Sequence, residues 1–429
     1  MDSREVEFLV VGSGAGGATL ARELAGKQRE VLVLERGSYE TQLGTLRDSF
    51  RYMDNNKVTK LPTTSNEDTI LWRALMAGGS TVVSLANMTP CLQAELAEYG
   101  ITLERELAEA EEEIKFAPID EALVGEGSRR VGEAAGALGY KMERMPKAID
   151  PAKCRRCGTC SAGCQFDAKW TALDYLQEAA EKGADLVCDT RVLEVLVENG
   201  RAKGVKAVGP AGVVEYRART VILAAGGLST PVILQASGID GAGMQLFIDL
   251  YVNTVGMTKD YGMLGEPAMA LVNHQFHQSK GFILSPYVPT FRASALAEYG
   301  AKGLALRRRR LIGLMAKTTD ELEGRVYPDG TFSKPVTKRD WARLNEGSTI
   351  STEILIGAGA NPKSILVSKV QGAHPGGTAA IGKVVDCDLQ TEIGNLFVCD
   401  ASVLPKAPGL PPILTIVALA KRLGQALAA

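Results

Sequence analysis

The chain has 429 residues, of which 45% are hydrophobic, so it is long enough to bury more than one hydrophobic core. Lys and Arg number 48 against 50 Asp and Glu, which leaves a formal net charge of -2. This balance excludes a global field of the kind that binds nucleic acid or anionic membranes, and it favours a small-molecule substrate.

The pattern of apolar residues predicts neither a leader sequence nor a membrane span. The first residues, MDSREVEF, carry charges where a signal peptide needs an apolar core. No segment approaches the roughly 18 uninterrupted apolar residues of a membrane-spanning helix. We therefore expect a cytoplasmic protein without a transmembrane segment.

The first predicted elements are a strand at 5–12, a helix that extends to about residue 25, and a second strand at 31–35. The turn between them fits the G-x-G-x-x-G fingerprint, which holds a dinucleotide pyrophosphate at a helix N-terminus. Glu35 ends the second strand, where an acidic residue holds the ribose hydroxyls. The candidate cofactor-binding residues here are Gly12, Ser13, Gly14, Ala15, Gly17, Glu35 and Arg36. The fingerprint alone does not separate FAD from NAD.

Further along the chain, helices are predicted within 93–140, from about 169 to 180 and from 231 to 237, and short strands within 184–226. Residues 241–370 are irregular, with strand-like runs near 281–287 and 352–357. We assign this segment to a substrate domain.

Four cysteines lie between the first helices and the strands. Cys154, Cys157, Cys160 and Cys164 have the C-x2-C-x2-C-x3-C spacing of a bacterial ferredoxin, which predicts one 4Fe-4S cluster. The fourth ligand is either Cys164 or a distant thiol, and the distant thiols are Cys91, Cys188, Cys387 and Cys399. Structural zinc is the alternative, because zinc also accepts four thiolates. A cluster would give a flavin a one-electron exit and so favours a dehydrogenase over an oxidase.

The C-terminal motifs resemble those of the glucose-methanol-choline oxidoreductase family. They read HPGGTAAIG from His374, NLFVCDAS from Asn395 and PPILT from Pro411, and the Gly78 to Thr81 turn and the AAGG strand end at 224–227 are similar too. The resemblance implies that the cofactor is FAD. It also implies cofactor contacts at Gly79, Ser80, Asn87, Val192, Ala225, Gly226, Asp400, Ala401, Pro412, Ile413 and Thr415. No histidine lies near Gly79 to tether the flavin, so FAD should be bound noncovalently.

The same resemblance makes His374 the candidate catalytic base, because a histidine titrates near neutral pH and can accept the proton of an alcohol. The family usually has a second His or Asn just before the proline that matches Pro412, but Pro411 stands there and has no side-chain donor. Either His374 works alone, or a residue from elsewhere supplies the second hydrogen bond, or the reaction is not simple alcohol oxidation.

Together these features predict an α/β protein with a Rossmann-like FAD-binding domain and an inserted α+β substrate domain built on an antiparallel sheet. The expected division is 1–240 for the FAD domain, 241–370 for the substrate domain and 371–429 for the C-terminal return. The expected activity is alcohol dehydrogenation, with electrons passed through the cluster to a protein acceptor such as a ferredoxin or a partner subunit. The alternatives are a flavin and iron-sulfur relay subunit, and an oxygen-using oxidase with a structural cysteine loop; a homo-oligomer and a hetero-oligomer both stay open.

Overall fold

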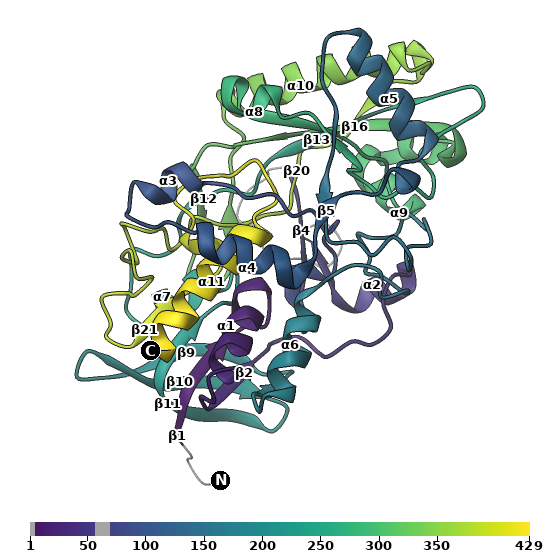
Figure 1. The fold of residues 1–429 in the computed structure, drawn as a ribbon. Helices are drawn as coiled ribbons and strands as arrows, with labels where there is room; N and C mark the ends of the chain where they lie inside the picture. The colour runs from purple at the N-terminus through teal and green to yellow at the C-terminus, as the bar shows by residue number, and fades with distance from the viewer. Residues whose placement is uncertain (1–4, 56–68) are drawn as a thin grey trace.

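The computed structural model describes residues 5–55 and 69–429, which fold around two large sheets (Figure 1). The first sheet has the order β8-β2-β1-β11-β10-β9, and β21 pairs with the end of β11. Its strands are β1 (Glu5–Val11), β2 (Val31–Leu34), β8 (Asp185–Val187), β9 (Arg191–Glu198), β10 (Arg201–Gly209), β11 (Gly212–Leu223) and β21 (Leu396–Val398). The strands β1, β2, β8, β11 and β21 run parallel, which confirms the Rossmann-like architecture.

Helices from both ends of the chain cover the first sheet. α1 (Ala15–Ala25) packs against α6 (Ala172–Glu181) and α11 (Ile413–Ala428), α11 also contacts α4 (Glu104–Ile114), and α7 (Thr230–Ala236) contacts β9. In Figure 1 the purple α1 and the yellow α11 therefore lie together, although they are the first and last helices of the chain. Their apolar faces and those of the central strands form one buried cluster, which includes Leu9, Leu20, Leu24 and Ile222.

The second sheet has the order β15-β16-β13-β20-β4-β3, and β19 also pairs with β13. Its strands are β3 (Met53–Asn55), β4 (Ile70–Ala74), β13 (Tyr251–Met257), β15 (Phe282–Pro286), β16 (Leu311–Thr318), β19 (Leu366–Val367) and β20 (Gln371–Gly372). The pairs around β13 and β16 are antiparallel, as expected for the middle of the chain, whereas β20 and β4 run parallel. The strand expected near 281–287 is β15.

α10 (Lys338–Gly357) packs across β13 and β16, with α5 (Glu126–Ala137) beside it and α8 (Gln275–Lys280) against β15. The strand-like reading of 352–357 is wrong, because these residues form the end of α10. The helix begins at a capping box formed by Thr337 and Asp340. The helix then buries residues at helical spacing. Its length and its capped start identify 352–357 as helical, which the short apolar run alone could not do.

Shorter elements connect these layers. A three-stranded sheet contains β12 (Met244–Leu246), β17 (Gly324–Val326) and β18 (Phe332–Ser333). Two-stranded pairs join β5 (Ala117–Pro118) to β7 (Pro146–Lys147), and β6 (Glu143–Arg144) to β14 (Leu271–Val272). The remaining α-helices of the described residues are α2 (Leu46–Tyr52), α3 (Gln93–Ala97) and α9 (Arg292–Tyr299). No helix in residues 5–55 and 69–429 combines the length and apolarity needed to cross a bilayer.

The sheets do not follow the expected division at residues 240 and 370. β3 and β4 come from the N-terminal segment and β20 from the start of the C-terminal segment, yet all three belong to the second sheet. Ile70 on β4 pairs with Gln371 on β20, which joins segments that are far apart in sequence. The two layers are therefore interleaved more deeply than the sequence indicates.

Candidate functional site

A large cavity of about 680 Å³ lies between the carboxyl ends of the parallel strands and the second sheet. Val11, Leu34 and Ala224, at the ends of β1, β2 and β11, line one side, and Trp72 and Tyr251 line the other. The candidate cofactor residues that line the cavity are Gly12, Ser13, Gly14, Ala15, Glu35, Arg36, Gly79, Ser80, Asn87, Val192, Ala225, Gly226, Asp400, Ala401, Pro412 and Ile413. Gly17 and Thr415 do not line it. Ligands bind at this edge of open α/β sheets.

The glycine turn before α1 has the shape that a pyrophosphate requires. Gly12 has a φ of +98°, and a Cβ at Gly12 would lie 2.3 Å from the carbonyl oxygen of Ala224. A Cβ at Gly17 would lie 1.9 Å from the oxygen of Gly12, so Gly17 serves close helix packing and not cofactor contact. By contrast, a Cβ at Gly14 or Gly226 would meet no protein atom within 4 Å. These two glycines leave open room at the cavity wall, which fits a bound dinucleotide.

Glu35 is fixed at the end of β2 by bonds within the protein. Its Oε2 accepts hydrogen bonds from the backbone nitrogen and the hydroxyl of Ser13 at 3.0 and 2.6 Å, and its Oε1 accepts one from Gly37 at 2.8 Å. Burial raises the pKa of Glu35, and the bonds from Ser13 oppose that shift. Burial lowers the pKa of the neighbouring Arg36 to about 10, and Arg73 adds to the effect. The carboxylate is thus held in place at the wall of the cavity.

Asp400 ties the end of β11 to the C-terminal segment. Its Oδ2 accepts hydrogen bonds from the Gly226 nitrogen at 2.8 Å and the Thr230 hydroxyl at 2.5 Å, and its Oδ1 accepts one from the Ser402 nitrogen at 2.7 Å. Thr415 instead pairs with Cys91, whose backbone nitrogen donates to the Thr415 hydroxyl at 3.0 Å. Pro412 and Ile413, at the start of α11, reach the cavity wall. Thr415 therefore anchors the helix behind that wall.

His374 lines the cavity and is oriented by a carboxylate that the sequence did not indicate. Its Nδ1 lies 2.8 Å from Oδ2 of Asp249, which is fully buried. Nε2 receives no hydrogen bond from any residue that the structure describes. Burial lowers the pKa of His374 below its usual value of 6.5, and the charge of Lys317 adds to this shift. The ring is therefore a neutral base with its free nitrogen available to a ligand.

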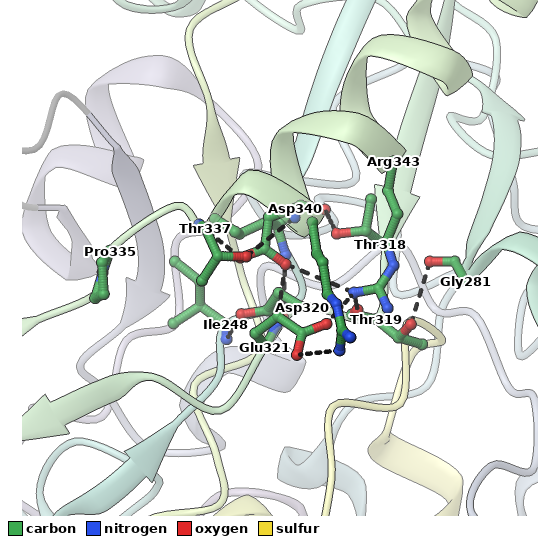
Figure 2. Close-up of polar contacts among 12 residues, drawn as sticks. Ile248, Gly281, Thr318, Thr319, Asp320, Glu321, Pro335, Thr337, Asp340 and Arg343 are labelled. Atoms are coloured by element: carbon green, nitrogen blue, oxygen red, sulfur yellow. Dashed lines mark hydrogen bonds and ion pairs between the residues drawn. The ribbon is translucent and has the colours of Figure 1, made fainter.

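A buried polar network at the end of β16 holds the backbone at Ile248, the residue before Asp249 (Figure 2). The nitrogens of Ile248 and Leu250 donate to the carboxylate of Asp320 at 3.1 and 3.4 Å, so the residues on both sides of Asp249 are fixed. Lys334 pairs with Asp320 at 3.0 Å, and both side chains are buried. Figure 2 also shows Arg343 and Asp340 of α10 bound to the Thr318 to Glu321 turn.

Two further cavity residues carry ionisable groups that sequence reasoning missed. Lys317 of β16 is 3% exposed, and burial lowers its pKa to about 8. Glu298 of α9 is also buried, which raises its pKa to about 7, and it accepts hydrogen bonds from Asn253 at 2.9 Å and Tyr287 at 3.3 Å. These residues belong to segments that the sequence marked only as substrate domain. A single Lys or Glu in an apolar strand or helix carries no motif that could have identified it.

The four-cysteine loop does not form a ligand set. No group of three or more His, Cys, Asp and Glu side chains in residues 5–55 and 69–429 is placed to hold a metal, and this range includes Cys154 to Cys164. Cys157 is exposed beside the Thr159 hydroxyl, and the Cys164 sulfur accepts a hydrogen bond from Ala168 at 3.4 Å. The expectation that the four sulfurs converge on a 4Fe-4S cluster or a zinc ion is therefore not supported. Ligand spacing along a loop was not sufficient to predict a ligand group among the described residues.

Two buried lysines lie behind this loop. Lys169 donates to the backbone oxygens of Val82, Ser84 and Cys160 at 2.6 to 2.8 Å. Lys147 donates to the oxygens of Leu85 and Asn87. Burial lowers the pKa of Lys147 to about 7 and that of Lys169 to about 8. Both lysines thereby fasten the segment from Val82 to Asn87, which forms part of the cavity wall.

A Rossmann-like sheet, a glycine cradle and a carboxylate-oriented histidine in one cavity define a dinucleotide-dependent oxidoreductase. Residues 6–251 and 326–420 match the N-terminal and C-terminal parts of the GMC oxidoreductase family. The chain belongs to this family and is an FAD-dependent oxidoreductase.

Relatives match along nearly the whole chain. An uncharacterised protein of Methanocaldococcus jannaschii is 30% identical over 427 residues, which cover 97% of this chain and 98% of the relative. A long-chain-alcohol oxidase of Arabidopsis thaliana is 26% identical, covering 96% of this chain and 66% of the relative. Among solved structures, pyridoxine 4-oxidase from Mesorbium loti has a TM-score of 0.77 at 17% identity, covering 98% of this chain and 99% of that chain. A formate oxidase variant from Aspergillus oryzae has a TM-score of 0.74 at 14% identity, covering 100% and 98%. The structural likenesses concern the fold.

Proposed function

We propose that the chain oxidises the CH-OH group of a small or long-chain alcohol to a carbonyl, with noncovalently bound FAD as hydride acceptor. The observation that supports this most directly is the His374 and Asp249 pair, which presents a neutral ring nitrogen to the cavity. Because one relative is a long-chain-alcohol oxidase of Arabidopsis, unbranched alcohols are the first substrates to test.

The residues of the chain supply the acid-base part of this reaction. His374 donates a hydrogen bond from Nδ1-H to the carboxylate of Asp249, so Nε2 carries the lone pair that takes the hydroxyl proton. Bound FAD would supply the acceptor for the hydride, that is two electrons and one proton, which the carbon loses as the O-H bond breaks. The remaining product is the aldehyde or ketone. Two electrons and two hydrogens leave the alcohol in total.

A turnover assay tests the proposal. The holoenzyme is given ethanol, 1-butanol, 1-octanol and 1-dodecanol, once without oxygen with an artificial acceptor dye, and once in air with peroxide detection. Dye reduction by an alcohol supports the proposal, and peroxide formed at a comparable rate identifies oxygen as the acceptor. Absence of turnover with any alcohol, in an enzyme that retains FAD, would favour an electron-relay subunit.

A histidine variant then separates catalysis from folding. His374→Asn should reduce kcat by roughly a hundredfold or more while FAD content stays unchanged, because a general base contributes about 10² to 10⁴. Asp120→Asn is the control, since Asp120 is exposed and does not line the cavity. Equal activity of His374→Asn and the unmodified enzyme would contradict the role of His374.

A second candidate concerns the exit of electrons through an iron-sulfur cluster at Cys154, Cys157, Cys160 and Cys164, toward a ferredoxin or partner subunit. One observation favours it: the buried Lys147 and Lys169 form no ion pair with a carboxylate among the described residues, and Lys169 donates to the Cys160 oxygen of the cysteine loop. Two cations at such a place suit a centre of negative charge. Against it, no group of three or more His, Cys, Asp and Glu side chains in the described residues is placed to hold a metal.

Iron, acid-labile sulfide and zinc per FAD, measured on anaerobically purified protein, decide this point. Four irons and a reduced-cluster signal in electron paramagnetic resonance would support a protein acceptor. Zinc, or no metal, would remove the cluster and leave the loop as a structural element.

A further inference from the structure

The hydroxyl oxygen of a substrate needs a hydrogen-bond donor that the C-terminal segment does not provide. His374 can accept the proton at Nε2 but, in its neutral form with Nδ1 bonded to Asp249, has no second N-H to donate there. Pro411 lines the cavity and carries no donor at all. Negative charge that develops on the oxygen as the proton leaves would therefore be uncompensated by these residues.

The strand register brings Lys317 to the same part of the cavity. Lys317 on β16 pairs with Tyr251 on β13, and Tyr251 pairs in turn with Gln371 on β20. Directly paired residues point to the same face of a sheet, and His374 follows β20 by two residues. Met315, two residues before Lys317, also lines the cavity, so this face of β16 is the cavity wall.

The ammonium group of Lys317 is buried and has no acceptor. Among residues 5–55 and 69–429, none forms a hydrogen bond or an ion pair with it, although its side chain lies in the cavity wall and is 3% exposed overall. Its charge nevertheless acts on nearby groups, because it helps to lower the pKa of His374. An unpaired buried cation is costly unless a ligand compensates it, so its position calls for an oxygen ligand.

We propose that Lys317 is the second catalytic residue, which donates a hydrogen bond to the substrate oxygen and stabilises its negative charge while His374 removes the proton. This inference rests on the proposed function and names the donor that Pro411 cannot supply. Lys317 is charged below about pH 8, where burial places its pKa. The ionisable groups that act on it or respond to its charge are Asp249, His374, His274 and Cys91. Among the charges, Asp249 has the largest effect on the pKa of Lys317 and raises it.

Kinetics of two variants test the proposal. Lys317→Met keeps the length of the side chain but removes the charge, and should lower kcat/KM by roughly a hundredfold, as the loss of an oxyanion donor does. Lys317→Arg keeps the charge and should retain more activity. The unmodified enzyme should lose kcat/KM above about pH 8. This alkaline limb should vanish in Lys317→Met and move to higher pH in Lys317→Arg. Lys206→Met, on the partly exposed β10, is the matched control.

Retention of kcat/KM within threefold by Lys317→Met, with the alkaline limb unchanged, would overturn the proposal. A loss of activity counts only if FAD content and the thermal midpoint match those of the Lys206→Met control.

Acetate binding provides a test that needs no turnover, so failure of the proposed alcohol oxidation would not obscure it. Acetate is added to the oxidised holoenzyme, and its Kd is read from the change in flavin absorbance. The Kd should rise about tenfold per pH unit above about pH 8, as the ammonium group loses its proton. Lys317→Met should bind acetate at least tenfold more weakly at pH 7. If that variant does not fold, the titration of the unmodified enzyme decides: no binding, or a Kd that is constant from pH 7 to 10, overturns the proposal.

Discussion

Replacing Asp249 by Asn should disable His374 without disturbing the cavity wall. Asp249 accepts two hydrogen bonds on its two oxygens, from His374 Nδ1 at 2.8 Å and from the Gly409 nitrogen at 2.9 Å. An asparagine has one acceptor and one donor, so one of the two N-H groups must face an NH₂ group. If the amide oxygen stays with Gly409, the NH₂ group donates to Nδ1, and His374 adopts the tautomer whose Nε2 carries the proton.

The size of the effect follows from this mismatch. To act as a base, His374 must return to the tautomer with Nδ1-H, which would then face an NH₂ group. A buried donor left without an acceptor costs about 1 to 3 kcal/mol, and each 1.36 kcal/mol is about a factor of ten in rate. Asp249→Asn should therefore lower kcat/KM by about 5 to 150-fold, with the loss mainly in kcat because substrate contacts stay in place.

Steady-state kinetics on the alcohol with the highest turnover measure this, with FAD content and circular dichroism as checks of folding. Asp120→Asn serves as the control, because Asp120 is an exposed carboxylate that accepts only the Ala122 nitrogen. A folded, FAD-loaded Asp249→Asn enzyme that keeps kcat/KM within twofold of the Asp120→Asn control would refute the reasoning.

Three more predictions follow from the same contacts. Gly17→Ala should lower the thermal midpoint even of the FAD-free protein, because its Cβ would lie 1.9 Å from a backbone oxygen. Gly14→Ala has no atom within 4 Å of its Cβ, so it should keep the thermal midpoint and weaken FAD binding. Equal thermal midpoints for the two variants would show that the helix can shift. Lys334→Met leaves Asp320 buried without its cation and should lower the free energy of unfolding by about 3 to 5 kcal/mol, measured by urea titration. A change of less than about 1 kcal/mol would mean that Asp320 takes up a proton instead. Because burial depresses the pKa of His374, the acid limb of kcat/KM should lie below pH 6.5: the base is neutral above its pKa, and activity falls only as the pH drops through it. A limb above pH 7 would contradict this assignment.

Much of the cofactor half of the site could be predicted because its residues follow one another along the chain. The glycine turn, the acidic end of β2 and the motifs around His374 and Asp400 are local patterns, and nearly all of the candidate residues line the cavity. The exceptions are also local in origin. Gly17 and Thr415 belong to helices whose first turns reach the cavity, but they point toward β1 and the Cys91 loop.

The substrate half could not be predicted, because it depends on pairing between distant strands. Lys317 and Asp249 acquire their positions from the register of β13 with β16 and from the contacts of Asp320. A strand such as β16, buried on both faces, shows no alternation that would indicate which side chains reach a cavity. The cysteine loop shows the opposite failure, since its spacing fits a metal while no group of three or more ligand side chains among the described residues is placed to hold one.

The parallel pairing of β4 with β20 determines when the second sheet can be completed during synthesis of the chain. During synthesis, Ile70 leaves the ribosome long before its partner Gln371, so β4 spends most of translation without its neighbour. Asp400 and α11, which complete the cavity, emerge later still. We therefore expect nascent chains arrested before residue 371 to bind no FAD, and released chains to acquire it only at the last step of folding. Arrested chains that retain the flavin would show that the first sheet can form its own binding site before the second sheet closes.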